Sequence, residues 1–324
     1  MKKSFYPLAH LFWKTQLSIL RACPSMHGLV VKRSMGATYS SGIWINALLR
    51  LIWGLPHALL EHCRNKREER FVIARITYLI TTRCTLQCDK CVSYIPDMPQ
   101  QDMPLDELSG DLERLLAGCD YIYAFIISGG EPFLHPDLDR LIRLCAASDK
   151  IGDISLQTNG TVVPGEKVLE ALREGKVLVK ISKYPAALQP DVEELKRVLT
   201  ENGVLHTHAS AKFWSDLSYT GQPHKGSGNR RFGVCVSHLC IPYLNGKLHH
   251  CIMAAYLAEN GVMCLEDEFI DLRTADPAAI RAQWQKMTET RVLASCSYCL
   301  GQTYKTPKIP VAVQRVPPGS DTAA

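Results

Sequence analysis

Short apolar runs alternate with amphipathic segments between residues 71 and 209. Apolar runs of strand length lie at 71–81, 121–128, 152–158, 176–182 and 204–209. Between them, residues 105–118, 137–148, 165–175 and 190–203 place apolar side chains at the three- and four-residue spacing of a helix with one buried face. The alternation predicts parallel βαβ units in an open sheet or barrel, with the chemistry in loops at the carboxyl ends of the strands.

The pattern changes after about residue 210. Two short apolar runs, 239–244 and 247–252, flank Asn245-Gly246, a pair typical of a hairpin turn. Residues 276–290 have a helical pattern and lead into "SCSYC". The tail at 306–324 is rich in proline and is predicted to be disordered.

Residues 1–70 form a separate zone of apolar stretches with basic flanks. Lys14 interrupts the first stretch, and Arg50 and Pro56 interrupt the second, so neither supplies the roughly 20 apolar residues of a membrane span. No compact signal-peptide core follows the opening "MKK". We expect a helical pair packed on the main domain; the alternative is a helix lying on an anionic membrane surface.

Charge and cysteine content narrow the class of protein. Residues 1–70 hold 11 Lys/Arg and 3 Asp/Glu, whereas the rest of the chain holds 26 and 29, so the main body carries no basic stripe for nucleic acid. Eight of the 13 cysteines fall in short groups, and the total is odd. This usage predicts metal or cluster ligation by reduced thiols in a cytoplasmic protein. Peripheral membrane contact through residues 1–70 stays the alternative to packing on the main domain.

The first cysteine group is "CTLQCDKC", with Cys84, Cys88 and Cys91 directly after the first apolar run. Three thiolates on one tight loop can hold three corners of an iron–sulfur cluster. Because the fourth corner has no cysteine nearby, one iron would stay open for a ligand, as in an open catalytic zinc site. The alternatives from spacing alone are a zinc knuckle and a fully ligated cluster that uses a distant cysteine.

Other polar positions follow the next strands. "SGGEP" comes after the run at 121–128, and its two glycines allow the backbone to approach a ligand closely. Asn159 and Ser182 stand at the ends of the third and fourth runs. Each feature alone is more often a plain turn or a polar strand end, but together they line one mouth of the predicted sheet.

In this combination and order, the chain resembles the radical S-adenosylmethionine (SAM) superfamily over roughly residues 73–210. The resemblance implies a partial (β/α)6 barrel and a 4Fe–4S cluster on the three cysteines of CTLQCDKC. It also implies that SAM binds the open iron, takes one electron and yields a 5′-deoxyadenosyl radical that abstracts a substrate hydrogen. The implied SAM contacts are Gly129, Gly130 and Glu131 for the methionine amino group, with Asn159 and Ser182 for the ribose and carboxylate.

The second cysteine group resembles the twitch extension of this superfamily, a shortened relative of the SPASM domain. The shared element is Gly246 followed by Cys251, and a distant pair lies at Cys296 and Cys299. This implies one auxiliary 4Fe–4S cluster rather than two. Five cysteines compete for four places: Cys235 fits the longer spacing to the turn, whereas Cys240 lies on the hairpin strand and is slightly favoured. Zinc held by four thiolates is the alternative.

These inferences divide the chain into an N-terminal extension (1–70), a core barrel (71–215), a hairpin-plus-helix auxiliary domain (216–305) and the tail (306–324). The predicted protein is an α/β radical SAM enzyme that oxidises or rearranges a small carbohydrate-like or natural-product substrate. It would receive electrons from a reductant such as flavodoxin or ferredoxin. The alternatives are a SPASM-type maturase acting on a peptide or protein, and a non-catalytic iron–sulfur or zinc protein.

Overall fold

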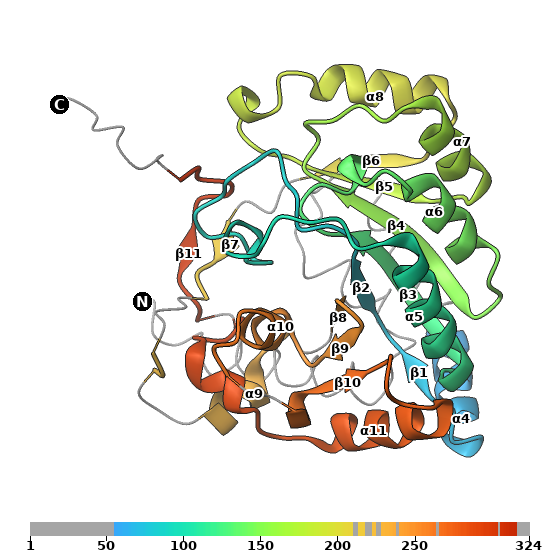
Figure 1. Cartoon of the computed structure of the whole chain (residues 1–324), viewed down its shortest axis with the longest axis vertical. Coiled ribbons are helices and arrows are strands. Elements are labelled where there is room, and N and C mark those ends of the chain that lie inside the picture. Colours follow the sequence, from blue (N-terminus) through green and yellow to red (C-terminus); the bar gives the residue numbers. More distant parts are fainter. Residues whose placement is uncertain are drawn as a thin grey trace.

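A computed structural model describes residues 55–209, 213–217, 222–224, 228–237, 240–263, 266–303 and 305–315. Most of the N-terminal extension, and with it both interpretations of that region, lies outside these ranges. Within them, no helix has the length and apolar character needed to cross a membrane. Figure 1 shows a central sheet with helices along its outer side and the C-terminal elements gathered at one end.

Strands and helices alternate along the barrel and become shorter beyond it. The helices are α4 (Leu55–Arg67), α5 (Leu105–Gly118), α6 (Leu138–Ala146), α7 (Glu166–Glu174), α8 (Val192–Glu201), α9 (Gly228–Val234), α10 (Ile252–Glu259) and α11 (Pro277–Glu289). The strands are β1 (Val72–Ile73), β2 (Ile76–Leu79), β3 (Tyr121–Ser128), β4 (Ile151–Thr158), β5 (Leu178–Ser182), β6 (His206–Ala209), β7 (Trp214–Ser215), β8 (Ile241–Leu244), β9 (Lys247–His249), β10 (Phe269–Asp271) and β11 (Lys308–Ile309).

One nine-stranded sheet organises the described part of the chain. Its order is β10-β9-β8-β2-β3-β4-β5-β6, with β1 paired to β3. The strands from β8 through β2 to β6 run parallel, whereas β8, β9 and β10 are antiparallel to one another. The sheet stays open between β6 and β10, so the predicted partial barrel is confirmed.

The predicted periodicity corresponds closely to these elements. Strand β3 and helix α5 have the predicted bounds, whereas the apolar run at 71–81 is divided into β1 and β2. Asn245 and Gly246 adopt φ values of 48° and 82° between β8 and β9, so the hairpin turn is confirmed. Helix α10, which follows Cys251 directly, was not predicted because its apolar residues show little periodicity.

The core is continuous across the predicted domain boundary at 215/216. Leu108, Leu112 and Leu115 of α5 are fully buried against the sheet, as their spacing predicts. Tyr243 of β8 belongs to the same core, and its ring stacks on that of Tyr78 of β2 with centroids 3.8 Å apart. The hairpin therefore extends the barrel sheet and shares its core rather than packing beside it as a separate layer. The domain boundary at 215/216 stays a prediction.

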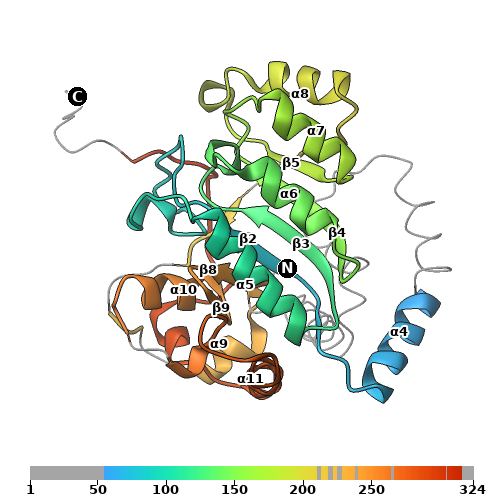
Figure 2. The ribbon, with the colours of Figure 1, turned by 45° about the vertical axis from the view of Figure 1, so that its right-hand side comes forward.

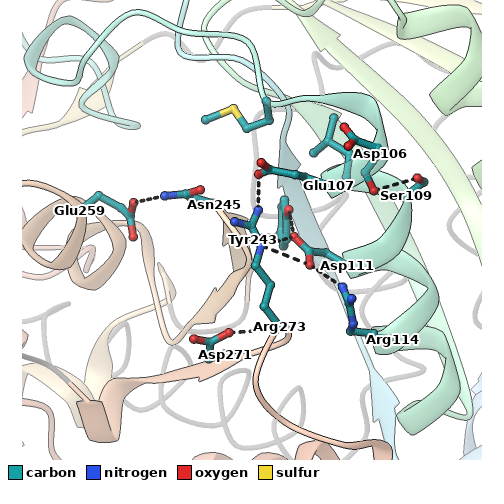
Figure 3. A network of polar contacts seen from close by, with 12 residues as sticks. Asp106, Glu107, Ser109, Asp111, Arg114, Tyr243, Asn245, Glu259, Asp271 and Arg273 are labelled. Carbon is teal, nitrogen blue, oxygen red and sulfur yellow. Dashed lines mark hydrogen bonds and ion pairs between the residues drawn. The ribbon is translucent and has the colours of Figure 1, made fainter.

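A buried carboxylate joins the C-terminal elements to α5 (Figure 3). Asp111 accepts a hydrogen bond from the Tyr243 hydroxyl at 2.7 Å, and its oxygens lie 3.1 Å from Arg273 Nε and 3.2 Å from Arg114 Nη1. Arg273 also pairs with Glu107 at 2.6 Å. A carboxylate this deep is tolerated because each oxygen has charged or hydroxyl partners. The network fixes the hairpin and the β10–α11 turn to the first helix of the barrel.

The residues from 308 to 315 differ from the predicted disordered tail. Strand β11 pairs with β7, and residues 312–315 lie against the cysteine loop, which we define as residues 83–94. Figure 1 shows β7 and β11 side by side at the edge of the molecule. We call residues 308–315 the C-terminal strap. A proline-rich composition did not prevent order here because the strap has a partner strand and a loop to pair with. Residues 316–324 of the predicted tail lie outside the described ranges.

Candidate cofactor site and a second cysteine cavity

The three cysteines of the cysteine loop line one cavity at the carboxyl ends of β2 to β5. This cavity has a volume of about 90 Å³, and its walls include Cys84, Cys88 and Cys91 from the loop. Gly129, Gly130, Asn159 and Ser182 line the same space, together with Ser128, Gln157, Tyr184 and Trp214. The structure thus brings together four of the five predicted SAM contacts with all three predicted cluster ligands.

The two glycines of SGGEP allow that loop to lie directly against the cysteine loop. A Cβ atom on Gly129 would stand 2.3 Å from the Thr81 carbonyl oxygen, and one on Gly130 would stand 2.1 Å from the Arg83 carbonyl oxygen. The amides of Gly130 and Glu131 donate to those same carbonyls at 2.9 and 2.8 Å. These amides are therefore used in holding the two loops together, and close backbone approach explains why glycine is needed at both positions.

Glu131 is fully buried and faces the end of β4 rather than the cavity. Its carboxylate accepts hydrogen bonds from Thr158 Oγ1 at 2.8 and 2.9 Å, and from the amides of Asn159 at 2.8 Å and Phe133 at 3.2 Å. Burial raises the pKa of Glu131 to about 7, against the effect of these donors. Its side chain therefore positions the SGGEP loop, so a direct contact with SAM would have to come from its backbone.

Asn159 connects β4 to the cysteine loop. Its Nδ2 donates to Thr85 Oγ1 at 3.0 Å and lies 3.5 Å from Cys84 Sγ, and its Oδ1 accepts from Thr161. Gln189, which the sequence did not single out, donates from Nε2 to the carbonyls of Asn159 at 2.5 Å and Ser182 at 2.7 Å. A buried Gln189 thus holds the ends of β4 and β5 in register at the cavity wall.

Burial raises the pKa of the Cys84, Cys88 and Cys91 thiols. Hydrogen bonds to sulfur act in the opposite direction: the amide of Leu86 lies 3.4 Å from Cys84 Sγ, and Gln314 Nε2 lies 3.3 Å from Cys88 Sγ. Donors to sulfur also favour the thiolate in a metal-bound state. The donor set of three thiols with N–H groups around them fits an iron–sulfur cluster.

A second cavity, of about 30 Å³, is lined by four of the remaining cysteines. They are Cys235, Cys251, Cys296 and Cys299, and their neighbours are largely apolar, such as Leu217, Ile252 and Met253. Three of these sulfurs accept a hydrogen bond from a backbone amide: Cys235 from Gln302 at 3.2 Å, Cys299 from Gly301 at 3.1 Å and Cys251 from Ala254 at 3.5 Å. Buried Glu268 accepts from the amides of Ala294 and Ser295, which orients the turn bearing Cys296.

Cys240 lies outside this cavity wall. Its Sγ is 2.9 Å from Thr77 Oγ1 of β2, on the barrel side of the hairpin. The sequence slightly favoured Cys240 because it stands on the hairpin strand, but the geometry favours Cys235, which lies at the end of α9 beside Cys299 and Gly301. Because β8 pairs in parallel with β2, the Cys240 thiol lies beside Thr77 rather than in the wall of the second cavity.

Burial also raises the pKa of three thiols in the second cavity, those of Cys251, Cys296 and Cys299, and neighbouring thiols add to the effect. The pKa of Cys296 and of Cys299 is raised to about 12, and that of Cys251 is raised well above its usual value. Arg231 partly offsets this effect at Cys299, and it donates to the Cys296 carbonyl at 2.9 Å. Four thiols with one cation in an apolar cavity are suited to ligands that neutralise them, such as iron or zinc.

Comparison with known proteins places the barrel in a family. Residues 78–208 match the family model described as the radical SAM superfamily. A GTP 3′,8-cyclase of Chlorobaculum tepidum is 34% identical over 96 residues, which cover 29% of this chain and 28% of that protein. A pre-heme d1 synthase of Dinoroseobacter shibae is 32% identical over 109 residues, which cover 33% of this chain and 26% of that protein.

A solved structure of BtrN in complex with AdoMet and 2-DOIA has a TM-score of 0.50 and 15% identity, covering 73% of this chain and 98% of that one. This likeness concerns the fold. Residues 78–208 therefore form a radical SAM domain, as the resemblance implied. The chain matches only slightly more than a quarter of the length of the two curated relatives.

Proposed function

We propose that this protein is a radical SAM enzyme. The observation that carries the proposal is the single cavity in which three cysteine thiols face the glycine loop and the strand-end residues Asn159 and Ser182. In this proposal Cys84, Cys88 and Cys91 hold a 4Fe–4S cluster with one iron open to SAM. When bound, the cluster and SAM supply a 5′-deoxyadenosyl radical that removes a hydrogen atom from the substrate.

The chain's own residues orient this chemistry. The Gly129–Gly130 backbone, held against the cysteine loop, offers carbonyl oxygens to the methionine amino group, and Asn159 and Ser182 offer polar groups to the ribose and carboxylate. Gln189 and Glu131 keep those groups in place by bonding to the strand ends. Tyr184 and Trp214, whose rings meet edge to face at a centroid distance of 5.9 Å, close one wall of the cavity against water.

We further propose that Cys235, Cys251, Cys296 and Cys299 hold an auxiliary 4Fe–4S cluster. Four thiols around one small apolar cavity support complete ligation by protein. Cys240 stays the alternative to Cys235, and zinc stays the alternative to a cluster. An auxiliary cluster gives a substrate radical an electron acceptor, which fits an oxidation.

The inner face of the barrel supports a small polar substrate. Strand pairing places Gln157, Lys180 and Thr207 in one row across β4, β5 and β6, next to the cavity wall. Lys180 Nζ donates to Ser155 Oγ at 2.9 Å, one row deeper. Both curated relatives bear names of enzymes acting on small molecules, which agrees with a carbohydrate-like or natural-product substrate; a peptide substrate is the alternative.

The test is an iron count combined with SAM cleavage. Anaerobically reconstituted protein should carry about eight irons if both sites hold 4Fe–4S clusters. With dithionite it should convert SAM to 5′-deoxyadenosine, measured by chromatography. Protein that holds both clusters and cleaves no SAM would be a non-catalytic iron–sulfur protein. About four irons with one zinc would replace the auxiliary cluster by zinc.

A further inference from the structure

The C-terminal strap reaches the cysteine loop from the far end of the chain. It leaves the C-terminal elements through β11, whose Lys308 and Ile309 pair with Ser215 and Trp214 of β7. The amide of Asp216 donates to the Pro307 carbonyl at 2.9 Å, which secures the entry. The strap therefore passes Trp214, which lines the cofactor cavity, before it meets the cysteines. Figure 2 shows the red C-terminal segment running close to the blue-green segment that follows β2.

At its end, the strap pairs with the cysteine loop through backbone hydrogen bonds. Cys88 and Gln314 form an antiparallel bridge. The amide of Asp89 donates to the Val313 carbonyl at 2.7 Å, and the amide of Arg315 donates to the Gln87 carbonyl at 2.7 Å. Bonds on both sides of Cys88 fix the backbone from which this thiol projects.

The Gln314 side chain uses both ends of its amide. Its Oε1 accepts from the amide of Gln87 at 2.8 Å, and its Nε2 donates to Cys88 Sγ at 3.3 Å and to the Ala312 carbonyl at 2.8 Å. Ala312 is 2% exposed and packs with Leu86 and Cys88 in a small apolar cluster of its own. The Nε2–H donor is thus held near Cys88 Sγ by two anchoring hydrogen bonds, to Gln87 and Ala312, beside this apolar cluster.

An N–H group aimed at a ligating sulfur stabilises the more negative state of an iron–sulfur cluster. Hydrogen bonds to the sulfurs and exclusion of solvent are two of the protein's means of setting the cluster's reduction potential. Gln314 supplies a hydrogen bond to the sulfur of Cys88. The strap helps to exclude solvent because it covers that side of the cysteine loop. Arg315 adds a positive charge nearby, paired with Asp97 at 2.7 Å.

We infer that Gln314 is a positioning residue for Cys88 that raises the reduction potential of the SAM-binding cluster, and that the strap couples this cluster to the folding of the C-terminal elements. The inference rests on the proposed cluster at Cys84, Cys88 and Cys91. It assigns a cofactor-tuning role to a position 226 residues away from Cys88 in the sequence.

The experiment replaces the donor and keeps the acceptor. In Gln314→Glu, a carboxylate oxygen still accepts from Gln87, but the group facing Cys88 Sγ no longer donates. We expect a more negative potential, so that the ratio of reduced to oxidised cluster at a fixed potential near the wild-type midpoint falls roughly three- to tenfold. The readout is an anaerobic redox titration by EPR, following the signal that changes when SAM is added.

Two further variants make the result specific. Gln314→Leu removes the donor without adding charge and should shift the potential in the same direction by a smaller amount. Gln283→Glu makes the same change at an exposed position on α11 and should leave the potential unchanged. Equal potentials for Gln314→Glu, Gln314→Leu and Gln283→Glu would overturn the inference, as would an equal shift of both clusters. A triple variant Cys84/Cys88/Cys91→Ala that keeps all of the wild-type iron would instead overturn the proposed function.

Discussion

The two cysteine sites of this protein are assembled in opposite ways. Cys84, Cys88 and Cys91 come from one loop of the barrel, within eight residues of chain. The second cavity collects Cys235, Cys251, Cys296 and Cys299 from the end of α9, the start of α10 and the turn after α11. The first site is therefore largely local in origin, whereas the second exists only when the C-terminal elements pack together.

Their surroundings differ as well. The first cavity is about three times larger and mixes thiols with glycine backbone, amide and hydroxyl groups, which suits a cluster together with a polar ligand. The second is small, apolar and surrounded by thiols, which suits a fully ligated centre. Under the proposed function, this difference corresponds to chemistry at the first site and electron acceptance or structural support at the second.

Removing one ligand from each site should have the largest effect. Cys88→Ala takes away one of three anchors and should abolish conversion of SAM to 5′-deoxyadenosine. Cys299→Ala should keep slow SAM cleavage in dithionite, because its sulfur lies in the other cavity. Both should fail with the true substrate. Chromatography of 5′-deoxyadenosine is the measurement, and Cys63→Ala, at an exposed cysteine, is the control.

Equal SAM cleavage by Cys88→Ala and wild type would contradict the role of the first site. Loss of cleavage in Cys299→Ala, with the first cluster intact by spectroscopy, would contradict only the division of labour.

Removing the Asp111 carboxylate should weaken the packing of the C-terminal elements, which contain the second site, against the barrel, which contains the first. Asp111→Ala leaves Arg273 Nε and the Tyr243 hydroxyl without their buried acceptor, at a cost of about 3–5 kcal/mol in the free energy of unfolding. Denaturant unfolding measures this loss, and iron at the second site should fall before iron at the first. Asp106→Ala, an exposed position on the same helix, should cost less than about 1 kcal/mol. A similar loss of unfolding free energy in both variants would show that the network does not hold the C-terminal elements to the barrel.

An added methyl group in the SGGEP loop should damage only the first site. Gly130→Ala forces a Cβ toward the Arg83 carbonyl, with an expected cost of about 1–3 kcal/mol and loss of SAM binding. The control is Gly165→Ala at the start of α7, where a Cβ meets no atom within 4 Å. SAM binding measured by equilibrium dialysis should separate the two variants. Normal binding by Gly130→Ala would show that the two loops can move apart.

Acidification should empty the second site first. Iron binds thiolates, so each raised thiol pKa makes protons compete more strongly, and affinity falls as pH falls. The proposed second site has four cysteine ligands against three at the first, and the pKa of two of them, Cys296 and Cys299, is raised to about 12. The second site should therefore lose up to about tenfold more affinity per pH unit. Iron retention between about pH 8.5 and 6.5, with Cys299→Ala reporting the first site alone, measures the difference. Parallel loss from both sites would contradict it.

The barrel and its first site were accessible from the sequence because they depend on local patterns. Strand and helix periodicity predicted β3, α5 and the parallel βαβ units, and Asn245-Gly246 predicted the hairpin. CTLQCDKC and SGGEP predicted residues that line one cavity, since parallel strands bring their carboxyl ends to the same edge of a sheet. Family resemblance added the roles that spacing alone left open between a cluster and a zinc site.

Other features depend on contacts between distant segments, which no local pattern records. Gln189 and Gln314 are ordinary polar residues in the sequence, and only packing places one between two strand ends and the other beside Cys88. Cys240 lies beside Thr77 rather than in the second cavity because β8 pairs in parallel with β2. The strap is ordered for the same reason: its hydrogen-bond partners lie more than 90 residues away in β7 and more than 200 residues away in the cysteine loop.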